Sequence, residues 1–274
     1  MSAAPLPPQG GEIVENALLG GRVRLRQPAK GYRAGMDAAL LAAAAGAGAG
    51  ERVLEAGCGA GAVLMQVAAR APGVRLTGVE RDPAMAALAR ENTALNGADA
   101  TVLTGDVAVG FRALGLEPFD RAIRNPPFFD DPGALRAPAA GKQGAWMADD
   151  GLAAWTRFLL KAVREGGRIV VIHRADRLAD LLTLLGETAG SFSVRPVHPH
   201  ADEPAKRVLV QAIKTGKAPL RLLPPLVLHD RSGGKHTVEA DAILRGEAGC
   251  PSDPPSLALD SRHVPAPAVR HPGL

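Results

Sequence analysis

The order of expected strands and helices is the feature that most constrains the fold of this chain. Short runs rich in β-branched residues alternate with stretches of helical periodicity. Strands are expected at 52–55, 75–80, 101–104, 121–123 and 168–172, and helices at 62–69, 83–96, 151–163 and 178–185. This alternation is typical of βαβ units, which place parallel strands in one sheet with helices on both faces.

Two further strands are expected near 192–197 and 208–213, joined by a loop without a helix. Such a connection favours antiparallel pairing, here at one edge of the sheet. The sequence therefore predicts an α/β, Rossmann-like fold with a seven-stranded, mostly parallel sheet, an antiparallel edge strand and helices on both faces.

The two ends of the chain differ in composition from its middle. Residues 1–11 are rich in Pro, Gly and Ala, and prolines recur without periodicity over 247–274, so we expect both segments to be disordered. One domain is predicted over 12–246. The two cysteines, Cys58 and Cys250, indicate no disulfide framework. With no signal peptide and no long apolar run, the sequence predicts a cytoplasmic protein without a membrane span.

Positive charge is moderate overall and locally clustered. The formal net charge is +4 and the sequence pI is about 9.4. Five basic residues fall close together near the N-terminus: Arg22, Arg24, Arg26, Lys30 and Arg33. A phosphate-contacting edge and a solvated basic face are both compatible with this cluster.

A glycine-rich turn follows the first expected strand, in Glu55-Ala56-Gly57-Cys58-Gly59-Ala60-Gly61-Ala62. Gly57 and Gly59 let the backbone approach a ligand closely, and Glu80, at the end of the next strand, can accept both hydroxyls of a ribose. The same residues also satisfy the dinucleotide fingerprint, so an NAD-dependent oxidoreductase remains an alternative. Two carboxylates favour another ligand, because Glu55 can orient the ammonium of a methionine moiety and Asp106 can accept a hydrogen bond from an adenine amine.

The segment Asn125-Pro126-Pro127-Phe128 follows the fourth expected strand and carries the expected catalysis. Two prolines restrict the turn, so the Asn125 side chain and the Pro126 carbonyl can each accept one hydrogen bond from a planar –NH2 group. Such bonds aim the nitrogen lone pair at a methyl donor, and Phe128 offers a face for stacking. Catalysis by this turn would rest on positioning and electrostatics.

In these residues the chain resembles class I methyltransferases with an (Asn/Asp)-Pro-Pro-(aromatic) motif, and from about Glu12 to Glu247 it resembles the bacterial tRNA1(Val) adenine-N6 methyltransferases. The resemblance implies S-adenosylmethionine as cofactor, tRNA as partner, and an adenine held by 125–128. It implies cofactor contacts from Glu55, Gly57, Glu80, Arg81, Asp106 and Asn125. It also implies that 27–37 closes over the cofactor. Phe128 departs from the family, which commonly has Tyr there.

Other substrates and classes stay open. Protein glutamine-N5 methyltransferases and other nucleic-acid amino methyltransferases share the motif, although the former carry a preceding helical domain for which only some thirty residues are available here. A non-catalytic RNA-binding module is a further alternative. We favour a monomer.

Several further residues are of types that occur in functional sites. No metal site is expected, because His198, His200, Asp202 and Glu203 lack convincing further ligands. His173 follows the fifth expected strand and could line the substrate cleft, although a surface position is the favoured interpretation. Trp155 is interpreted as a packing anchor, and so is Trp146, although its loop could reach the substrate. Cys58 is interpreted as a small filler.

Overall fold

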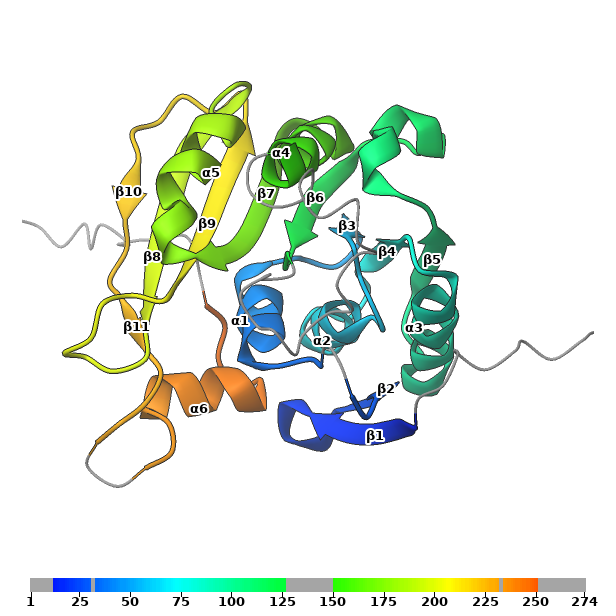
Figure 1. The fold of residues 1–274 in the computed structure, drawn as a ribbon, viewed down its shortest axis with the longest axis horizontal. Helices are drawn as coiled ribbons and strands as arrows, with labels where there is room; N and C mark the ends of the chain where they lie inside the picture. The colour runs from blue at the N-terminus through cyan, green and yellow to red at the C-terminus, as the bar shows by residue number, and fades with distance from the viewer. Residues whose placement is uncertain (1–11, 31–32, 127–149, 232–233, 251–274) are drawn as a thin grey trace, which may run out of the picture.

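A large twisted sheet with helices on both faces dominates the computed structural model, which describes residues 12–30, 33–126, 150–231 and 234–250 (Figure 1). The sheet has nine strands, in the order β10-β8-β9-β7-β6-β3-β4-β5, with β11 also paired to β8. The seven longer strands are β3 (Arg52–Ala56), β4 (Arg75–Glu80), β5 (Ala100–Thr104), β6 (Phe119–Arg124), β7 (Val163–Arg174), β8 (Ala189–His198) and β9 (Arg207–Lys214).

The seven predicted strands are confirmed, and the structure adds to them at one edge. β9 pairs antiparallel with β8, as expected, but it also pairs antiparallel with β7. The sequence predicts the antiparallel strand at the edge of the sheet. In the structure this strand is β9, and it lies between β8 and β7. Two short strands, β10 (Arg221–Leu222) and β11 (Leu226–Val227), pair parallel with β8 on its other side and were not predicted.

Helices cover the sheet in two groups. One face carries α1 (Met36–Ala44), α2 (Ala62–Arg70), α3 (Pro83–Asn96) and α6 (Val238–Arg245). The other carries α4 (Asp150–Ala162), α5 (Leu178–Leu185), and the 3-10 turns η2 (Val107–Val109) and η3 (Phe111–Leu114). Two more 3-10 turns border these layers: η1 (Leu19–Gly21) contacts α6, and η4 (Ala175–Arg177) contacts α5. The boundaries of α3 follow its sequence: Asp82 caps its N-terminus, Pro83 is its first residue, and Gly97 ends it with a left-handed conformation.

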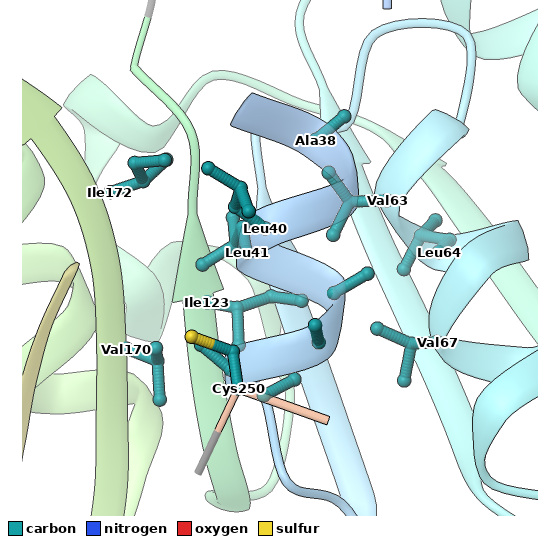
Figure 2. Close-up of a cluster of buried hydrophobic side chains, with 14 of the residues drawn as sticks. Ala38, Leu40, Leu41, Val63, Leu64, Val67, Ile123, Val170, Ile172 and Cys250 are labelled. Atoms are coloured by element: carbon teal, nitrogen blue, oxygen red, sulfur yellow. The ribbon is translucent and has the colours of Figure 1, made fainter. Parts of the chain in front are cut away.

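Alternate residues of the central strands face two separate hydrophobic cores. In β7, Val170 and Ile172 pack with α1 and α2, whereas Ile169 and Val171 pack with α4 and α5. Figure 2 shows the first core, where Ile123 of β6 and the two β7 residues meet the apolar side chains of α1. Strands that are buried on both faces explain the continuous apolar runs by which the sequence identified them.

An antiparallel hairpin, β1 (Ile13–Leu18) and β2 (Val23–Pro28), packs against α3 and was not predicted. Two asparagines of α3 attach it. Asn92 accepts from the Arg26 N–H and donates to the Arg26 carbonyl, and Asn96 makes the same pair of bonds with Arg24. These side-chain amides take the place of a neighbouring strand along one edge of β2.

The chain stays packed beyond α6 as far as Cys250. The four residues 247–250 were expected to belong to the tail, yet the Cys250 N–H donates to the Ala43 carbonyl of α1 and the Cys250 side chain is buried. Arg70 donates to the carbonyls of Ile243 and Ala248 and so holds the end of α6 against α2. In the part of the chain that the structure describes, no helix is long and apolar enough to cross a membrane.

Candidate active site

A cavity of about 530 Å³ opens at the carboxyl ends of β3, β4, β5, β6 and β7. Open α/β sheets bind their ligands at this edge. One half of the cavity is formed by the ends of β3, β4 and β5 with Glu55, Gly57, Gly59, Glu80, Arg81 and Asp106. The other half is formed by β6, β7, α4 and α5 with Arg124, Asn125, Pro126, Trp155, His173 and Arg177.

The glycine turn between β3 and α2 has a backbone conformation that residues other than glycine rarely adopt. Gly57 and Gly59 have φ values of 72° and 53°. The Gly57 N–H donates to the Val79 carbonyl, and the Gly59 N–H donates to Oε2 of Glu80. The turn is therefore fastened to the end of the neighbouring strand β4, and both glycines line the cavity.

Glu55 is a buried carboxyl at the base of this cavity. Burial raises its pKa well above the usual value, which the Leu64 N–H and the Arg124 guanidinium only partly oppose. Its Oε2 atom is buried and has no hydrogen-bond partner among the residues described here. An unsatisfied buried acceptor is costly unless a ligand donates to it. The carboxylate thus fits the ammonium group of a methionine moiety, as the sequence predicts.

Glu80 and Asp106, the other two predicted acidic residues, line the same half of the cavity and already bond to backbone. Glu80 accepts the Gly59 N–H on one oxygen and the Asp82 N–H on the other. Asp106 accepts the Ala108 N–H and so caps η2. Each carboxylate oxygen has a second lone pair, so these bonds orient the carboxylates without exhausting them. Arg81 lies beside them at the rim and is exposed.

Cys58 lies within the glycine turn and is buried. Burial raises the pKa of its thiol well above the ordinary value, and the nearby Glu55 and Glu80 raise it further. A thiol in such surroundings stays protonated at neutral pH and is a poor nucleophile. This agrees with its interpretation as a small filler.

The predicted catalytic turn enters the cavity from the end of β6. Asn125 is buried, and it lines the cavity together with Pro126. Pro127 and Phe128, which complete the motif, lie outside the described residues, as does Trp146. The first two residues of the motif and the glycine turn thus share one cavity.

Arg124, immediately before the motif, was not identified from the sequence. It is buried, its Nη1 donates to the Ala56 carbonyl at 2.6 Å, and its guanidinium stacks on the ring of Trp155. Trp155 comes from α4 and also lines the cavity, so it does more than anchor packing. The cation–π contact and the hydrogen bond fix the residue that precedes Asn125.

His173 is the penultimate residue of β7 and lines the cavity, in contrast to the favoured interpretation of it as a surface residue. Its Nδ1 accepts the Arg174 N–H at 2.9 Å. Burial, aided by the positive charges of Arg177 and Arg124, lowers its pKa to about 4, so the ring is neutral at physiological pH. No sequence periodicity pointed to this residue, because its surroundings come from other strands and helices.

The segment 27–37, expected to close over the cofactor, contributes to the cavity wall. Gln27 of β2 and Ala34 both line the cavity, and Gln27 accepts the Ala34 N–H on its side chain. Gln27 also donates to Asn16 of β1. Residues 31 and 32 of this segment lie outside the described residues.

The histidines around the β8–β9 loop gather without forming a metal centre. His200, His229 and His236 lie in a row, with ring centroids 5.5 Å and 5.2 Å apart, and His198 bonds to the Glu203 carbonyl. Over the described ranges, no group of three or more His, Cys, Asp or Glu side chains is arranged to hold a metal ion.

The known proteins that this chain resembles in sequence or structure are methyltransferases. Residues 34–138 match the family model of the methyltransferase small domain. A predicted O-methyltransferase from Agrobacterium tumefaciens is 29% identical in sequence, with a TM-score of 0.65 over 78% of this chain and 98% of that one. A class I S-adenosylmethionine-dependent methyltransferase structure from Listeria monocytogenes is 15% identical, with a TM-score of 0.52 over 77% of this chain and 68% of that one.

Two further comparisons add nothing on the substrate. TrmN from Thermus thermophilus is 21% identical over 62% of this chain and 46% of that one, and its TM-score of 0.46 is too low to support an argument. No curated protein sequence matches the chain.

The fold, the cavity and these matches define the class of protein. The chain has the Rossmann-like class I methyltransferase fold and is an enzyme that transfers methyl groups. Its methyl donor is S-adenosylmethionine. The alternatives of an NAD-dependent oxidoreductase and of a non-catalytic RNA-binding module are therefore set aside.

Proposed function

We propose that this enzyme methylates the exocyclic N6 amine of an adenine in RNA, and that the RNA is a tRNA. The observation that carries the proposal is that Asn125 and Pro126 line the same cavity as Glu55 and the glycine turn. The rest of the support is the sequence motif of 125–128 and its resemblance to tRNA adenine-N6 methyltransferases.

Glu55, Gly57, Gly59, Glu80, Arg81 and Asp106 are proposed to hold the cofactor. The buried Oε2 of Glu55 would accept from the ammonium, and Glu80, already oriented by two backbone N–H groups, would accept from the ribose hydroxyls. Asp106 would accept from the adenine amine. When bound, S-adenosylmethionine supplies an electrophilic methyl group on its sulfonium sulfur.

Asn125 and Pro126 are proposed to hold the amine of the substrate. Two accepted hydrogen bonds hold both N–H groups, withdraw the nitrogen lone pair from conjugation with the ring and aim it at the methyl donor; the methylated amine then loses a proton. Asn125 is buried and directly follows Arg124, whose guanidinium stacks on Trp155, so its backbone position is defined by a fixed neighbour. Pro127 and Phe128 complete the proposed turn, with Phe128 stacking on the base.

The cavity half around Asn125 carries charge of the sign that RNA requires. Arg174 and Arg177 line it at the end of β7 and the start of α5. Each also pairs with a carboxylate close to it in the sequence: Arg174 with Asp176 of η4, and Arg177 with Asp180 of α5. Paired arginines keep donors for a phosphate, because a guanidinium has five N–H groups. The proposed domain starts at residue 12 and reaches beyond the predicted end at 246 to Cys250, and we propose that it acts in the cytoplasm.

Radiolabelled S-adenosylmethionine and total RNA test the proposal directly. We expect label in the tRNA fraction and N6-methyladenosine in its nucleoside digest by mass spectrometry. Exclusive 2′-O-methylation would instead favour an oxygen acceptor, and label in protein alone would favour a glutamine amide. Either result overturns the proposal.

Two substitutions at one position separate catalysis from folding. Asn125→Ala removes the acceptor, and we expect kcat to fall about 10²- to 10³-fold with cofactor affinity retained. Asn125→Asp keeps an acceptor at the same place and should retain more activity than Asn125→Ala. Equal activity of the wild type and Asn125→Ala would remove Asn125 from the proposed mechanism.

A further inference from the structure

The two faces of strand β2 have different surroundings. Leu25 and Gln27 are buried and line the cavity. Arg24 and Arg26, at the alternate positions, lie on the other face, and their side chains are 58% and 44% exposed. The basic residues that cluster in the sequence therefore form part of the outer surface of the cavity wall.

Most of the surplus positive charge of the protein lies in and directly after this hairpin. Residues 12–33 contain five basic side chains and two acidic ones, a surplus of three, while the whole chain has a formal net charge of +4. On the other side of the cavity, Arg174 and Arg177 are each balanced by an aspartate. The hairpin side of the cavity is thus the side with an excess of positive charge.

The outer face of the hairpin holds two arginines around one carboxylate. Glu15 of β1 accepts from Nε of Arg24 at 2.8 Å and from Nε of Arg26 at 3.3 Å. The hydrogen bond from Arg24 lowers the pKa of Glu15, so the carboxyl is ionised and the group of three keeps one positive charge. Among the described residues, the Nη groups of both arginines have no hydrogen-bond partner.

These Nη groups have the geometry and position to bind phosphates. A guanidinium binds a phosphate through two parallel N–H groups, and an exposed ion pair is weak enough for a phosphate to compete with it. Arg24 and Arg26 are about 7 Å apart along one strand. The strand itself is fixed, because Asn92 and Asn96 hold its backbone. Arg22 differs, since its guanidinium donates to the Gly246 carbonyl after α6.

Two further basic residues continue this surface towards the cavity. Lys30 and Arg33 follow β2 and are exposed. Arg33 donates to Oδ1 of Asn16 in β1 at 3.1 Å, and the next residue, Ala34, lines the cavity. Positive side chains therefore extend from the outer face of the hairpin to the cavity rim.

We propose that the Arg24–Arg26 face of the hairpin, continued by Lys30 and Arg33, binds the phosphate backbone of the substrate RNA outside the cavity. The proposal rests on the proposed function, since it requires an RNA substrate. An RNA is much larger than the one nucleotide that enters the cavity, so it must also lie on the surface around it. Contacts to phosphates hold the RNA in place without reading its sequence.

Filter binding of end-labelled total tRNA over a range of salt concentrations tests the two arginines. Arg24→Gln and Arg26→Gln should each raise the Kd about 3- to 10-fold and reduce its salt dependence by about one phosphate contact. In methylation assays the KM for tRNA should rise while kcat stays unchanged. Cofactor affinity should also stay unchanged, because Asn92 and Asn96 hold β2 through its backbone.

Arg164→Gln is the matched control for these variants. Arg164 is also 58% exposed and also bonds a carboxylate through Nε, that of Asp120. It lies at the start of β7, whereas the cavity is at the carboxyl ends of the strands. Its loss should leave tRNA binding unchanged. If Arg24→Gln and Arg26→Gln bind tRNA as Arg164→Gln does, the face belongs to solvent or to another partner, and the proposal is wrong.

Glu15→Gln tests the same face through a gain of affinity, which a folding defect would not produce. The variant removes the carboxylate that competes with phosphate for Arg24 and Arg26, so the Kd for tRNA should fall about 2- to 5-fold. Glu165→Gln is its control, because Glu165 is an exposed partner of Lys214 near the start of β7. Equal effects of the two variants would indicate net charge alone and contradict the proposed site.

Failure of the inference and failure of the proposed function give different results. If the wild type methylates adenosine in tRNA and the hairpin variants bind tRNA as the wild type does, only the docking surface is lost. If the wild type neither binds nor methylates RNA, the proposed function is lost and this inference with it.

Discussion

Arg124 donates from Nη1 to the carbonyl of Ala56, 2.6 Å away, and so joins the end of β6 to the start of the glycine turn. The bond connects the two halves of the cavity, because Asn125 follows Arg124 and Gly57 follows Ala56. The Arg124 side chain also fills the space beside Gly57, so that a larger residue would not fit there. A Cβ atom on Gly57 would lie 2.6 Å from Nη1 of Arg124 and 2.9 Å from the Trp155 ring.

Gly57→Ala should therefore destabilise the cofactor-free protein more than Gly59→Ala. Both glycines have positive φ, at 72° and 53°, so both substitutions carry a backbone cost of about 1–2 kcal/mol. A Cβ on Gly59 meets nothing within 4 Å, which makes it the matched control. We expect Gly57→Ala to lose a further ~1–3 kcal/mol in denaturant unfolding. Equal losses would show that Arg124 and Trp155 yield without cost.

Glu55→Gln should stabilise the cofactor-free protein while weakening cofactor binding. Burial raises the pKa of Glu55 in the folded state, so its contribution to stability is present at low pH and is lost as pH rises through that folded pKa. The glutamine does not titrate and avoids this loss. Thermal unfolding from about pH 5 to about pH 9 should show the melting temperatures diverging in favour of the variant as pH rises.

The same substitution removes a charged acceptor from the proposed ammonium contact. We expect calorimetric titration with S-adenosylmethionine to give a Kd about 10- to 100-fold higher for Glu55→Gln. A stabilised variant with unchanged affinity would place the ammonium elsewhere.

Asn92→Ala should loosen both the hairpin and the cavity. Asn92 bonds to both backbone groups of Arg26 and donates to the Ala60 carbonyl of the glycine turn. Its loss should cost about 2–4 kcal/mol of unfolding free energy and raise the Kd for S-adenosylmethionine, since the turn loses a contact.

Asn96→Ala is the control for that prediction. Asn96 bonds to Arg24 in the same way but has no bond to the glycine turn among the contacts described here. We expect it to cost some stability and to leave cofactor affinity near the wild-type value. Equal effects on affinity would mean that the hairpin, rather than the Ala60 contact, governs binding.

His173 should make the protein sensitive to acid. Its pKa is about 4 in the folded state and about 6.5 in an unfolded chain. The unfolded state therefore binds the proton first, and stability falls as pH drops from about 6.5 towards about 4. The loss should reach about 1–3 kcal/mol for a partly buried ring. In His173→Asn this component should vanish, whereas His229→Asn, outside the cavity, should keep it.

The main sheet was accessible to sequence reasoning because its strands are buried on both faces. β4 begins and ends where the sequence predicted, and the alternation of Val170 and Ile172 with Ile169 and Val171 leaves a continuous apolar run. β1 and β2 were missed for the opposite reason. In β2 the exposed Arg24 and Arg26 alternate with buried Leu25, and the arginines were interpreted as a charge cluster instead of one face of a strand.

The sequence predicted only those site residues whose type suits a cofactor contact and whose position is at the end of an expected strand. Glu55, Glu80 and Asp106 end or follow consecutive parallel strands, so topology alone brings them together. His173, Arg124 and Trp155 meet in the same cavity because β7, β6 and α4 pack there, which local periodicity does not encode. The interpretation of His173 as a surface residue was wrong for this reason.

The short strands β10 and β11 have a consequence for how the enzyme behaves at high concentration. Without further strands, the ten-residue β8 would be an edge strand with unpaired backbone N–H and C=O groups. Such an edge can pair with a strand of another molecule and so initiate aggregation. Here two-residue strands occupy that side at Arg221–Leu222 and Leu226–Val227. Between them lie Pro224 and Pro225, which have no N–H to offer. This edge of the sheet thus consists of two short strands separated by prolines, which gives a strand of another molecule no continuous backbone to pair with.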